Sequence, residues 1–442
     1  MTTILWFRRD LRLTDHPAMV EAARDDAVLP VVVLDPSQLD GPNVVARDRF
    51  LAGVEALREA MGGDLVIRIG DPREVIPDLV RAVGARAVHA SRDHGPRGER
   101  RDAEVAARLT VPLVHTGSQY AVSPDRIGKA DGSAYRVFTP FLAAWLRHGW
   151  RPPAPTVHPR WVQAPSEDSA TFRARSGIEM EAGEARALAR WQTFREDNAY
   201  ASRRDRPDLD GTTRLSAALR FGEIHPRTML AGLGDEPGDA KLRSELAWRE
   251  FAGHLLHHFP HTVSSPMDSR FEGMRWDVGP DADARFEAWR EGRTGFPFVD
   301  AGMRQLRDTG WMHNRVRMVA ASFLVKHLHI DWRRGAGWFA ERLADFDLAS
   351  NTLGWQWTAG CGADAAPYHR VFNPVLQGQR FDPDGDFVRA YVPELHHLPG
   401  ATVHEPWRAA LAAGYPPRII DLDVERREAL ARLREIRGGG AE

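Results

Sequence analysis

The sequence predicts an α/β N-terminal domain, built on a parallel, doubly wound sheet, followed by an all-α C-terminal domain. Over residues 1–125, short β-rich runs alternate with amphipathic helical patterns, as in βαβ units. After residue 181 the strand signal disappears, and apolar residues recur at the three- and four-residue spacing of helices. A proline-rich stretch at 151–170 separates the two patterns, and we expect residues 126–180 to form an interdomain connector before the helical domain at 181–442.

Five β-rich runs and three helical patterns make up the predicted α/β domain. The predicted strands are 4–7, 28–34, 65–69, 87–90 and 112–115, and the predicted helices are 48–61, 73–83 and 99–109. Polar residues follow the strands, among them Arg8, Arg9, Asp10 and Asp35. Because open parallel sheets bind ligands at the carboxyl ends of their strands, a ligand site is expected there.

The composition excludes several classes of protein. Among the 442 residues, 59 Lys and Arg balance 61 Asp and Glu, so the chain has no global basic field for nucleic acid or an anionic membrane. The single cysteine, Cys361, excludes an intramolecular disulfide framework and multi-cysteine metal sites. No signal peptide or membrane-spanning apolar run is visible. We therefore expect a cytoplasmic protein without membrane contact, and a monomer.

Four histidines at 254, 257, 258 and 261 raise the alternative of a metal site. The Glu of an H-E-x-x-H motif is missing, Pro260 interrupts the helix before His261, and no carboxylate or thiol completes the set. We therefore expect no metal.

Two segments carry side chains suited to a phosphorylated ligand. In 211–227, Thr212, Thr213 or Ser216 is expected to cap a helix whose free N–H groups, with Arg214, would receive a phosphate, although an ordinary helix cap is the alternative. In 244–261, helical spacing brings Glu245, Trp248 and Arg249 onto neighbouring faces, where a structural ion pair is the alternative.

The stretches 309–335 and 345–374 carry the strongest pattern. The first is predicted to place five side chains on adjacent helical faces: Trp311, Asn314, Arg315, Arg317 and Met318. The second places three polar residues before a tryptophan pair: Asp345, Asp347 and Asn351, then Trp355 and Trp357. Acids, an amide and guanidinium groups around aromatic rings suit a planar heterocycle with many hydrogen-bond acceptors. Eight of the 14 tryptophans fall between Trp248 and Trp357, more than a core usually requires.

These motifs resemble those of the photolyase/cryptochrome family of blue-light flavoproteins, and most of all its class I cyclobutane pyrimidine dimer photolyases. The resemblance rests on WFRRDLRLTD at the start, followed by WREF, TGWMHNRVRM, DWRRG and GWQW in this order, and it extends to HEPW at 404–407. It implies an antenna-binding α/β domain at 1–125 and an FAD- and DNA-binding helical domain at 181–442.

The resemblance also implies which residues bind reduced FAD (FADH⁻). They are Tyr200, Thr212, Thr213, Arg214, Leu215, Ser216, Leu242, Glu245, Arg249, Trp311, Asn314, Arg317, Asp345, Asp347 and Asn351. The sequence departs from several members at Leu242, where they carry Trp.

Electron-transfer, catalytic and DNA-binding roles follow from the same resemblance. Trp355, Trp332 and Trp289 match a tryptophan relay between the flavin and the protein surface. Glu245, Trp248, Asn314, Met318 and Trp357 match the residues around a flipped-out pyrimidine dimer. Arg204, Arg315, Arg370 and Gln377 match positions near the DNA backbone, beside the dimer contacts Trp248, Asn314 and Trp357.

Within the family, the expected partner is damaged DNA, single- or double-stranded, and the expected activity is light-driven repair of cyclobutane pyrimidine dimers. The (6-4) photolyases carry a histidine pair where Asn314 and Met318 stand. A cryptochrome-like photosensor is the alternative, but plant-type cryptochromes have Asp at the position of Asn351, and no long tail follows the helix predicted at 423–436.

The antenna pigment is expected to be 8-hydroxy-5-deazaflavin. Another pigment or no antenna is the alternative, and methenyltetrahydrofolate is less favoured. Folate-binding members have an Asn-Glu pair where this sequence has Arg97 and Gly98. Arg9 and Asp35, at strand ends, are candidate contacts of the pigment.

Overall fold

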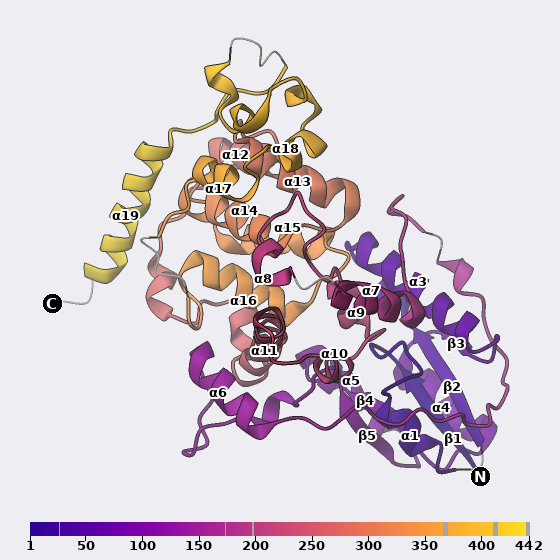
Figure 1. Cartoon of the computed structure of the whole chain (residues 1–442). Helices are drawn as coiled ribbons and strands as arrows, with labels where there is room; N and C mark the ends of the chain where they lie inside the picture. Colours follow the sequence, from indigo (N-terminus) through magenta and orange to yellow (C-terminus); the bar gives the residue numbers. More distant parts are fainter. Residues whose placement is uncertain (26, 173, 197–198, 366–369, 410–413, 439–442) are drawn as a thin grey trace. The chain divides into compact units, whose positions relative to one another are not determined.

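The structure, a computed structural model, describes residues 1–25, 27–172, 174–196, 199–365, 370–409 and 414–438 (Figure 1). The chain divides into two compact units. Unit 1 comprises Met1–Asn198, Thr213–Pro260 and Ala344–Phe346. Unit 2 comprises Ala199–Thr212, His261–Leu343 and Asp347–Glu442. Among the described residues, no helix combines the length and the apolar character needed to cross a membrane.

A five-stranded parallel sheet organises unit 1, as the sequence predicts. Its strand order is β3-β2-β1-β4-β5. The strands are β1 (Thr2–Phe7), β2 (Ala27–Leu34), β3 (Val66–Ile69), β4 (Val88–Arg92) and β5 (Leu113–Ser118). The order reverses between β1 and β4, so the carboxyl ends of these two strands form the topological switch point, where open parallel sheets bind ligands.

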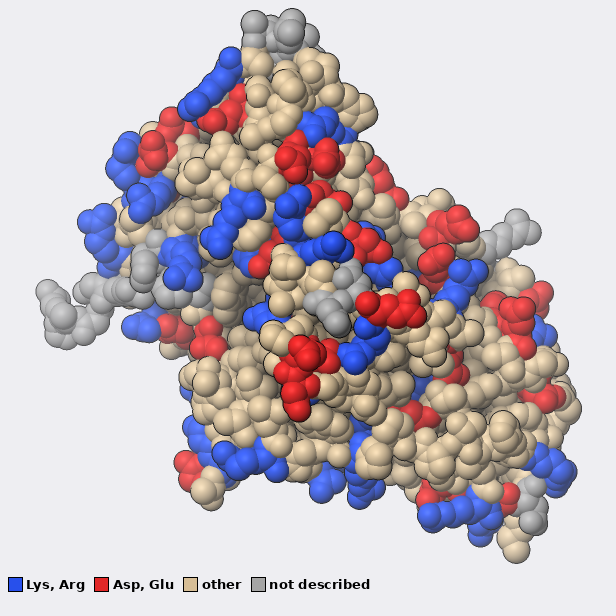
Figure 2. Space-filling model, in the orientation of Figure 1, with Lys and Arg blue, Asp and Glu red and all other residues tan. Residues whose placement is uncertain are grey.

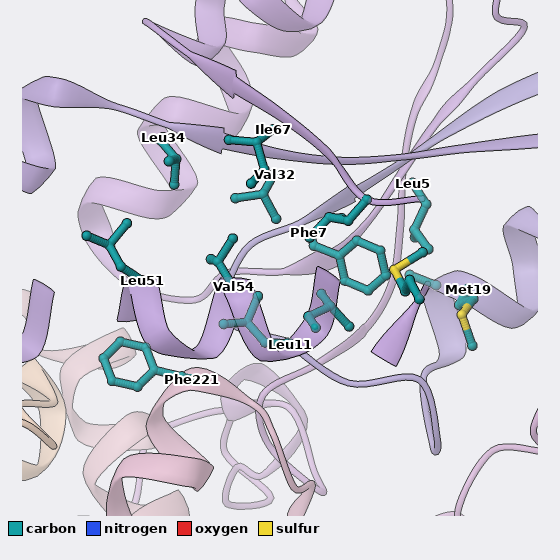
Figure 3. Close-up of a cluster of buried hydrophobic side chains, with 14 of the residues drawn as sticks. Leu5, Phe7, Leu11, Met19, Val32, Leu34, Leu51, Val54, Ile67 and Phe221 are labelled. Carbon is teal, nitrogen blue, oxygen red and sulfur yellow. The ribbon is translucent and has the colours of Figure 1, made fainter. Parts of the chain in front are cut away.

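Both faces of the sheet are buried, which confirms the doubly wound α/β prediction. Leu5 and Phe7 of β1 point into one cluster, which helices α1 (Pro17–Ala22) and α3 (Val44–Ala60) cover (Figure 3). Ile4 and Trp6 point to the other side, where α4 (Pro72–Val83) and α5 (Pro96–Ala106) complete a second cluster. This alternation follows from the two-residue period of a strand.

Unit 1 also contains several helices beyond the sheet. They are α2 (Pro36–Leu39), α6 (Phe138–His148), α7 (Glu184–Glu196), α9 (Ser216–Phe221), α10 (Pro226–Ala231) and α11 (Pro237–His258), with 3₁₀ turns η1 (Pro124–Arg126) and η2 (Ser169–Thr171). Helix α6 lies inside the segment expected to be a connector. The rest of that segment is irregular, but it is fixed to the sheet, because Val28 exchanges backbone hydrogen bonds with Arg160 (3.0 Å) and Val162 (2.9 Å).

The segment containing α9 and α10 is joined tightly to the α/β layer, although the sequence analysis places it in the helical domain. The Leu11 N–H donates to the Phe221 carbonyl (3.1 Å), and Phe221 completes the cluster in Figure 3. Gly222 has φ +71°, and a Cβ there would lie 2.1 Å from the Arg9 carbonyl oxygen. Only glycine allows this approach of the two backbones.

The described residues of unit 2 form helices joined by turns and irregular segments, without a strand. Its helices are α8 (Tyr200–Arg203), α12 (Pro280–Glu291), α13 (Pro297–Thr309), α14 (Asn314–Lys326), α15 (Trp332–Arg342), α16 (Leu348–Ala359), α17 (Pro374–Phe381), α18 (Asp386–Tyr391) and α19 (Leu422–Gly438). Short 3₁₀ turns at Ser269–Gly273, Pro393–Leu395, Gly400–His404 and Pro406–Arg408 connect them, and another, Pro260–Val263, begins at the last residue of unit 1's second segment. The all-α prediction for this part of the chain is therefore confirmed.

Candidate active site

In unit 1, the predicted phosphate-binding residues Thr213 and Arg214 lie in the turn before α9. Helix α9 begins at Ser216, and its N-cap residue is Leu215, so Thr212, Thr213 and Ser216 do not cap it as expected. Thr213 Oγ1 instead accepts a hydrogen bond from the Leu215 N–H (3.3 Å). Arg214 is exposed and adopts φ +51°, a left-handed conformation that is uncommon for a residue with a side chain.

This turn fits a phosphate group. Within the described residues, the N-cap residue of α9, Leu215, forms no side-chain hydrogen bond to the helix. Arg190 Nε fixes the turn by donating to the Thr213 carbonyl (3.1 Å). The exposed guanidinium of Arg214 supplies a forked donor of the kind that pairs with phosphate oxygens.

Helix α11 presents Glu245, Trp248 and Arg249 as the spacing predicts. The three side chains are partly exposed, whereas Leu242, one turn earlier, is buried. Trp248 stacks on Phe138 of α6, with ring centroids 3.7 Å apart and an interplanar angle of 10°. One indole face is thereby covered by Phe138.

Arg249 is held by backbone carbonyls and an aromatic ring. Its guanidinium donates to the carbonyls of Gln119 (2.9 Å) and Leu219 (3.3 Å) and lies 5.0 Å from the centre of the Tyr120 ring. Glu250 anchors the same turn of α11, because it accepts hydrogen bonds from Trp145 Nε1 (2.7 Å) and the Val122 N–H (3.0 Å). Burial raises the pKa of Glu250 to about 7.

Asp345 belongs to unit 1 by its contacts. It is buried, with 7% exposure, and its neighbour Phe346 accepts a hydrogen bond from Arg220 Nε (2.6 Å). Arg220 lies in α9, so this short segment is fixed to the helix that follows the predicted phosphate-binding turn.

In unit 2, Tyr200, Arg204 and Thr212 lie on and after the short helix α8. The guanidinium of Arg204 lies 5.5 Å from the centre of the Tyr200 ring. Gly211 closes the turn before Thr212, where a Cβ would lie 2.7 Å from the Arg203 carbonyl oxygen. The backbone conformation that precedes Thr212 therefore requires glycine at position 211.

The start of α14 carries Asn314, Arg315, Arg317 and Met318. Asn314 Nδ2 lies 4.0 Å from Met318 Sδ, so these two side chains share one face. Trp311 is not on this helix, contrary to the sequence analysis. Helix α13 ends at Thr309, and Trp311 stands in the turn between the two helices.

Asp347 is the N-cap residue of α16, and its side chain accepts a hydrogen bond from the Ser350 N–H (3.0 Å). Asn351 Nδ2 donates to the Ala336 carbonyl (3.2 Å). Trp355 is buried, with 2% exposure, whereas Trp357 is partly exposed. Of the two indoles on this helix, Trp355 therefore lies in the protein interior and Trp357 is in contact with solvent.

The three predicted relay tryptophans all belong to unit 2. Trp289 and Trp355 are direct neighbours, with ring centroids 6.2 Å apart, and Phe339 contacts both rings. Trp289 and Trp332 are 0% and 2% exposed. Trp289 therefore does not itself reach the surface, and its place in the electron relay stays a prediction.

Trp276 is a tryptophan that the sequence analysis left without a role. It is partly exposed, and its neighbour Asp277 donates its N–H to the His329 carbonyl (2.9 Å), three residues before Trp332. Trp276 is one of the eight clustered tryptophans in the sequence. Its solvent exposure, which only the structure shows, distinguishes it from the buried Trp289.

The predicted DNA-contacting residues of unit 2 are partly engaged with protein. Arg315 donates to Asp205 (2.9 Å), and Arg204 Nε lies 3.9 Å from the same carboxylate. Arg370 is exposed, and Gln377 is partly exposed on α17. The carbonyl of Arg370 accepts a hydrogen bond from buried Lys326 (3.3 Å), whose pKa burial lowers to about 8.

Two family models match the chain. Residues 3–160 match the model described as DNA photolyase, and residues 242–435 match the model of the FAD binding domain of DNA photolyase. A deoxyribodipyrimidine photo-lyase from Thermus thermophilus is 41% identical over 99% of this chain and 99% of its own length.

Solved structures give the same result. A bacterial class III photolyase from Agrobacterium tumefaciens has a TM-score of 0.86 at 35% identity, covering 99% of this chain and 98% of its own. An archaeal photolyase from Sulfolobus tokodaii, solved with two FAD molecules, has a TM-score of 0.86 at 29% identity. The match covers 98% of this chain and 100% of that one. A cryptochrome from Synechocystis has a TM-score of 0.87 at 26% identity. The match covers 97% of this chain and 98% of that one.

A doubly wound α/β layer and a helical part that matches an FAD-binding domain define a class of flavin-binding protein. The chain belongs to the DNA photolyase family.

Proposed function

We propose that this protein is a light-driven deoxyribodipyrimidine photo-lyase that repairs cyclobutane pyrimidine dimers in DNA. The 41% sequence identity to the Thermus thermophilus photo-lyase, over 99% of each chain, supports this activity. One observation in this chain carries the choice of lesion. Asn314 and Met318 share a face at the start of α14, where (6-4) photolyases carry their histidine pair.

FAD is the cofactor of the proposed reaction. The residues that would hold it are those named from the family resemblance, among them Arg214, Arg249, Asn314 and Asn351. When bound in its reduced form, FAD supplies the photoexcited electron that splits the cyclobutane ring.

The chain's own residues bind and orient the lesion. Photolyases are base-flipping enzymes, and a dimer that stacks poorly leaves the duplex at a lower free-energy cost than intact bases. In this proposal Trp248 and Trp357 stack against the extruded dimer, Met318 supplies an apolar contact, and Asn314 and Glu245 hydrogen-bond to its carbonyl and N–H edges. Such hydrogen bonds also stabilise negative charge that arrives on the pyrimidine carbonyls.

A local set of arginines is sufficient for binding DNA. Figure 2 shows Lys and Arg interspersed with Asp and Glu on the visible face, as the net charge of −2 implies. We therefore propose that Arg204, Arg315, Arg370 and Gln377 make a few backbone contacts. The affinity for DNA should then depend on salt concentration as expected for a protein that neutralises only a few phosphates.

Asn351 favours the repair enzyme over a cryptochrome-like photosensor. Its amide donates to the Ala336 carbonyl (3.2 Å), a hydrogen bond that an ionised Asp cannot donate. The backbone of α15 thus selects an amide at the position where plant-type cryptochromes have Asp.

For the antenna we propose 8-hydroxy-5-deazaflavin, bound in unit 1 at the switch point of the sheet. Gly98 argues against folate, because a Cβ there would lie 2.2 Å from Asp93 Cγ and the turn has no room for the Glu of folate-binding members. The two FAD molecules of the Sulfolobus tokodaii photolyase make a second FAD the other outcome of an absorption spectrum.

Repair by the purified protein tests the proposal. After complete reduction of the flavin, blue light should split thymine dimers in single- and double-stranded DNA, and dark controls should show no repair. A fully reduced sample that leaves cyclobutane dimers intact under blue light would overturn it.

A further inference from the structure

Three side chains that are distant in sequence come together within unit 1: His94, Glu99 and His257. His94 follows β4, Glu99 lies in the first turn of α5, and His257 lies in the last turn of α11. One ligand atom from each lies within 4.8 Å of the other two. From the sequence we expect no metal, because no carboxylate completes the histidine set, but Glu99 supplies a carboxylate from a different helix.

His94 is the most telling member of the group. It is 3% exposed, and among the described residues neither of its ring nitrogens has a hydrogen-bond partner. A buried polar group without a partner is unfavourable unless something else satisfies it.

The turn between β4 and α5 holds His94 and Glu99 in place. Asp93 accepts a hydrogen bond from the Gly95 N–H (3.0 Å) and forms an ion pair with Arg9. The missing Cβ of Gly98 leaves room for Asp93, as noted above. This turn therefore does not have to be ordered when a ligand binds, which favours affinity.

The surrounding charges are compatible with a cation. Glu99 Oε1 lies 3.9 Å from His257 Nδ1 and 4.0 Å from an Arg92 nitrogen. Arg92 in turn pairs with Asp125 (3.2 Å), which offsets its charge. Of the neighbouring histidines, His254 is already bonded, to the Pro124 carbonyl and the Tyr135 N–H.

We propose that His94, Glu99 and His257 bind one divalent transition-metal ion such as Zn²⁺. Two imidazoles and one carboxylate select zinc-like ions over Mg²⁺ and Ca²⁺, which prefer oxygen ligands. Tetrahedral coordination places ligand atoms about 3.3 Å apart, so the two partly exposed members, Glu99 and His257, move inward by roughly 1 Å. A water molecule occupies the fourth position.

The ion would link the β4–α5 turn to the end of α11, two parts of unit 1 that are remote in sequence. Because metal binding to the folded state adds to its stability, Zn²⁺ should raise the melting temperature of the protein.

Calorimetric titration of the flavin-loaded, chelator-treated full chain with ZnCl₂ tests the proposal. We expect one saturable equivalent in the wild type. His257→Asn should weaken binding by roughly 100-fold or more, and Glu99→Gln by roughly 10–100-fold, since a first ligand matters at least as much as its outer partners. Both variants change partly exposed side chains, and retained flavin absorbance shows that they fold.

His258→Asn is the matched control, because His258 is the next residue of the same helix and is exposed. It should bind Zn²⁺ as the wild type does and show the same rise in melting temperature. No saturable binding by the wild type, or equal loss in His258→Asn and His257→Asn, would overturn the proposal. Neither result depends on DNA repair.

Discussion

The buried and the partly exposed tryptophans of this protein differ in what surrounds them. Trp289 and Trp355 lie in the interior of unit 2, in contact with each other and with Phe339. Trp248 in unit 1 and Trp357 in unit 2 each keep part of their surface in solvent. The same residue type is therefore used in two ways: buried indoles suit electron transfer, and accessible indoles suit stacking against a ligand.

The largest expected effect is on the buried set. Trp355→Phe should abolish photoreduction of oxidised flavin and leave repair intact once the flavin has been reduced chemically, because Phe is far harder to oxidise than Trp. Photoreduction followed by flavin absorbance, with and without dithionite, measures both. The same assay on Trp276→Phe and Trp289→Phe identifies the outer end of the relay. Because Trp276 is partly exposed, we expect flavin photoreduction to be slower in Trp276→Phe than in Trp289→Phe. Unchanged photoreduction in Trp355→Phe would contradict the relay.

For the accessible set, Trp248→Ala should weaken binding to dimer-containing DNA by about 5–150-fold, since stacking of a base on an aromatic ring contributes about 1–3 kcal/mol. Photoreduction should be unchanged. Trp248→Phe, which keeps an aromatic face, is the control, and it should retain most of the affinity in a fluorescence-anisotropy titration. Equal loss in both variants would show that the indole acts through something other than stacking.

A smaller effect is expected from the packing around Trp355. A Cβ at Gly335 would lie 2.1 Å from Trp355 Cη2, so Gly335→Ala should displace the indole, reduce the free energy of unfolding by about 1–3 kcal/mol and slow photoreduction. Gly337→Ala on the same helix has nothing within 4 Å of its new Cβ and should stabilise by about 0.5–1 kcal/mol. Urea unfolding compares the two, and equal stabilisation by both would contradict the packing argument.

The smallest effect concerns the arginines that are paired with protein. Asp205→Asn should release Arg315 for phosphate and tighten DNA binding by roughly 2–5-fold, in line with the strength of exposed ion pairs. The slope of affinity against salt should steepen by about 0.9 for each phosphate gained. Asp283→Asn, which breaks the exposed pair with Arg334 (2.8 Å), is the charge-matched control. An identical gain in the control would assign the effect to net charge alone.

The fold was largely predictable because its signals are local. Each predicted strand overlaps an observed one, since apolar runs such as 28–34 are buried on both faces of the sheet. The spacing of Glu245, Trp248 and Arg249 is fixed by the helix alone. The displacement of Trp311 from α14 depends on Gly310, which adopts φ +66° at the end of α13, and that conformation cannot be read from apolar periodicity.

Parts of the site depend on contacts between distant segments, and these were not predictable. The burial of Trp289 and the meeting of Glu99 with His257 follow from tertiary packing. The association of 213–260 with the α/β layer rests on contacts such as the ion pair between Arg49 and Glu223. Composition changes along the chain cannot report such pairings, because they compare neighbours in sequence only.

The close approach at Gly222 bears on how the chain matures during synthesis. The cluster that holds β1, α1 and α3 includes Phe221, so it stays incomplete while only the first 198 residues have left the ribosome. Nascent protein of that length exposes an apolar surface that its own later residues must cover. Completing this core cluster therefore requires a segment that is translated long after the last strand of the sheet.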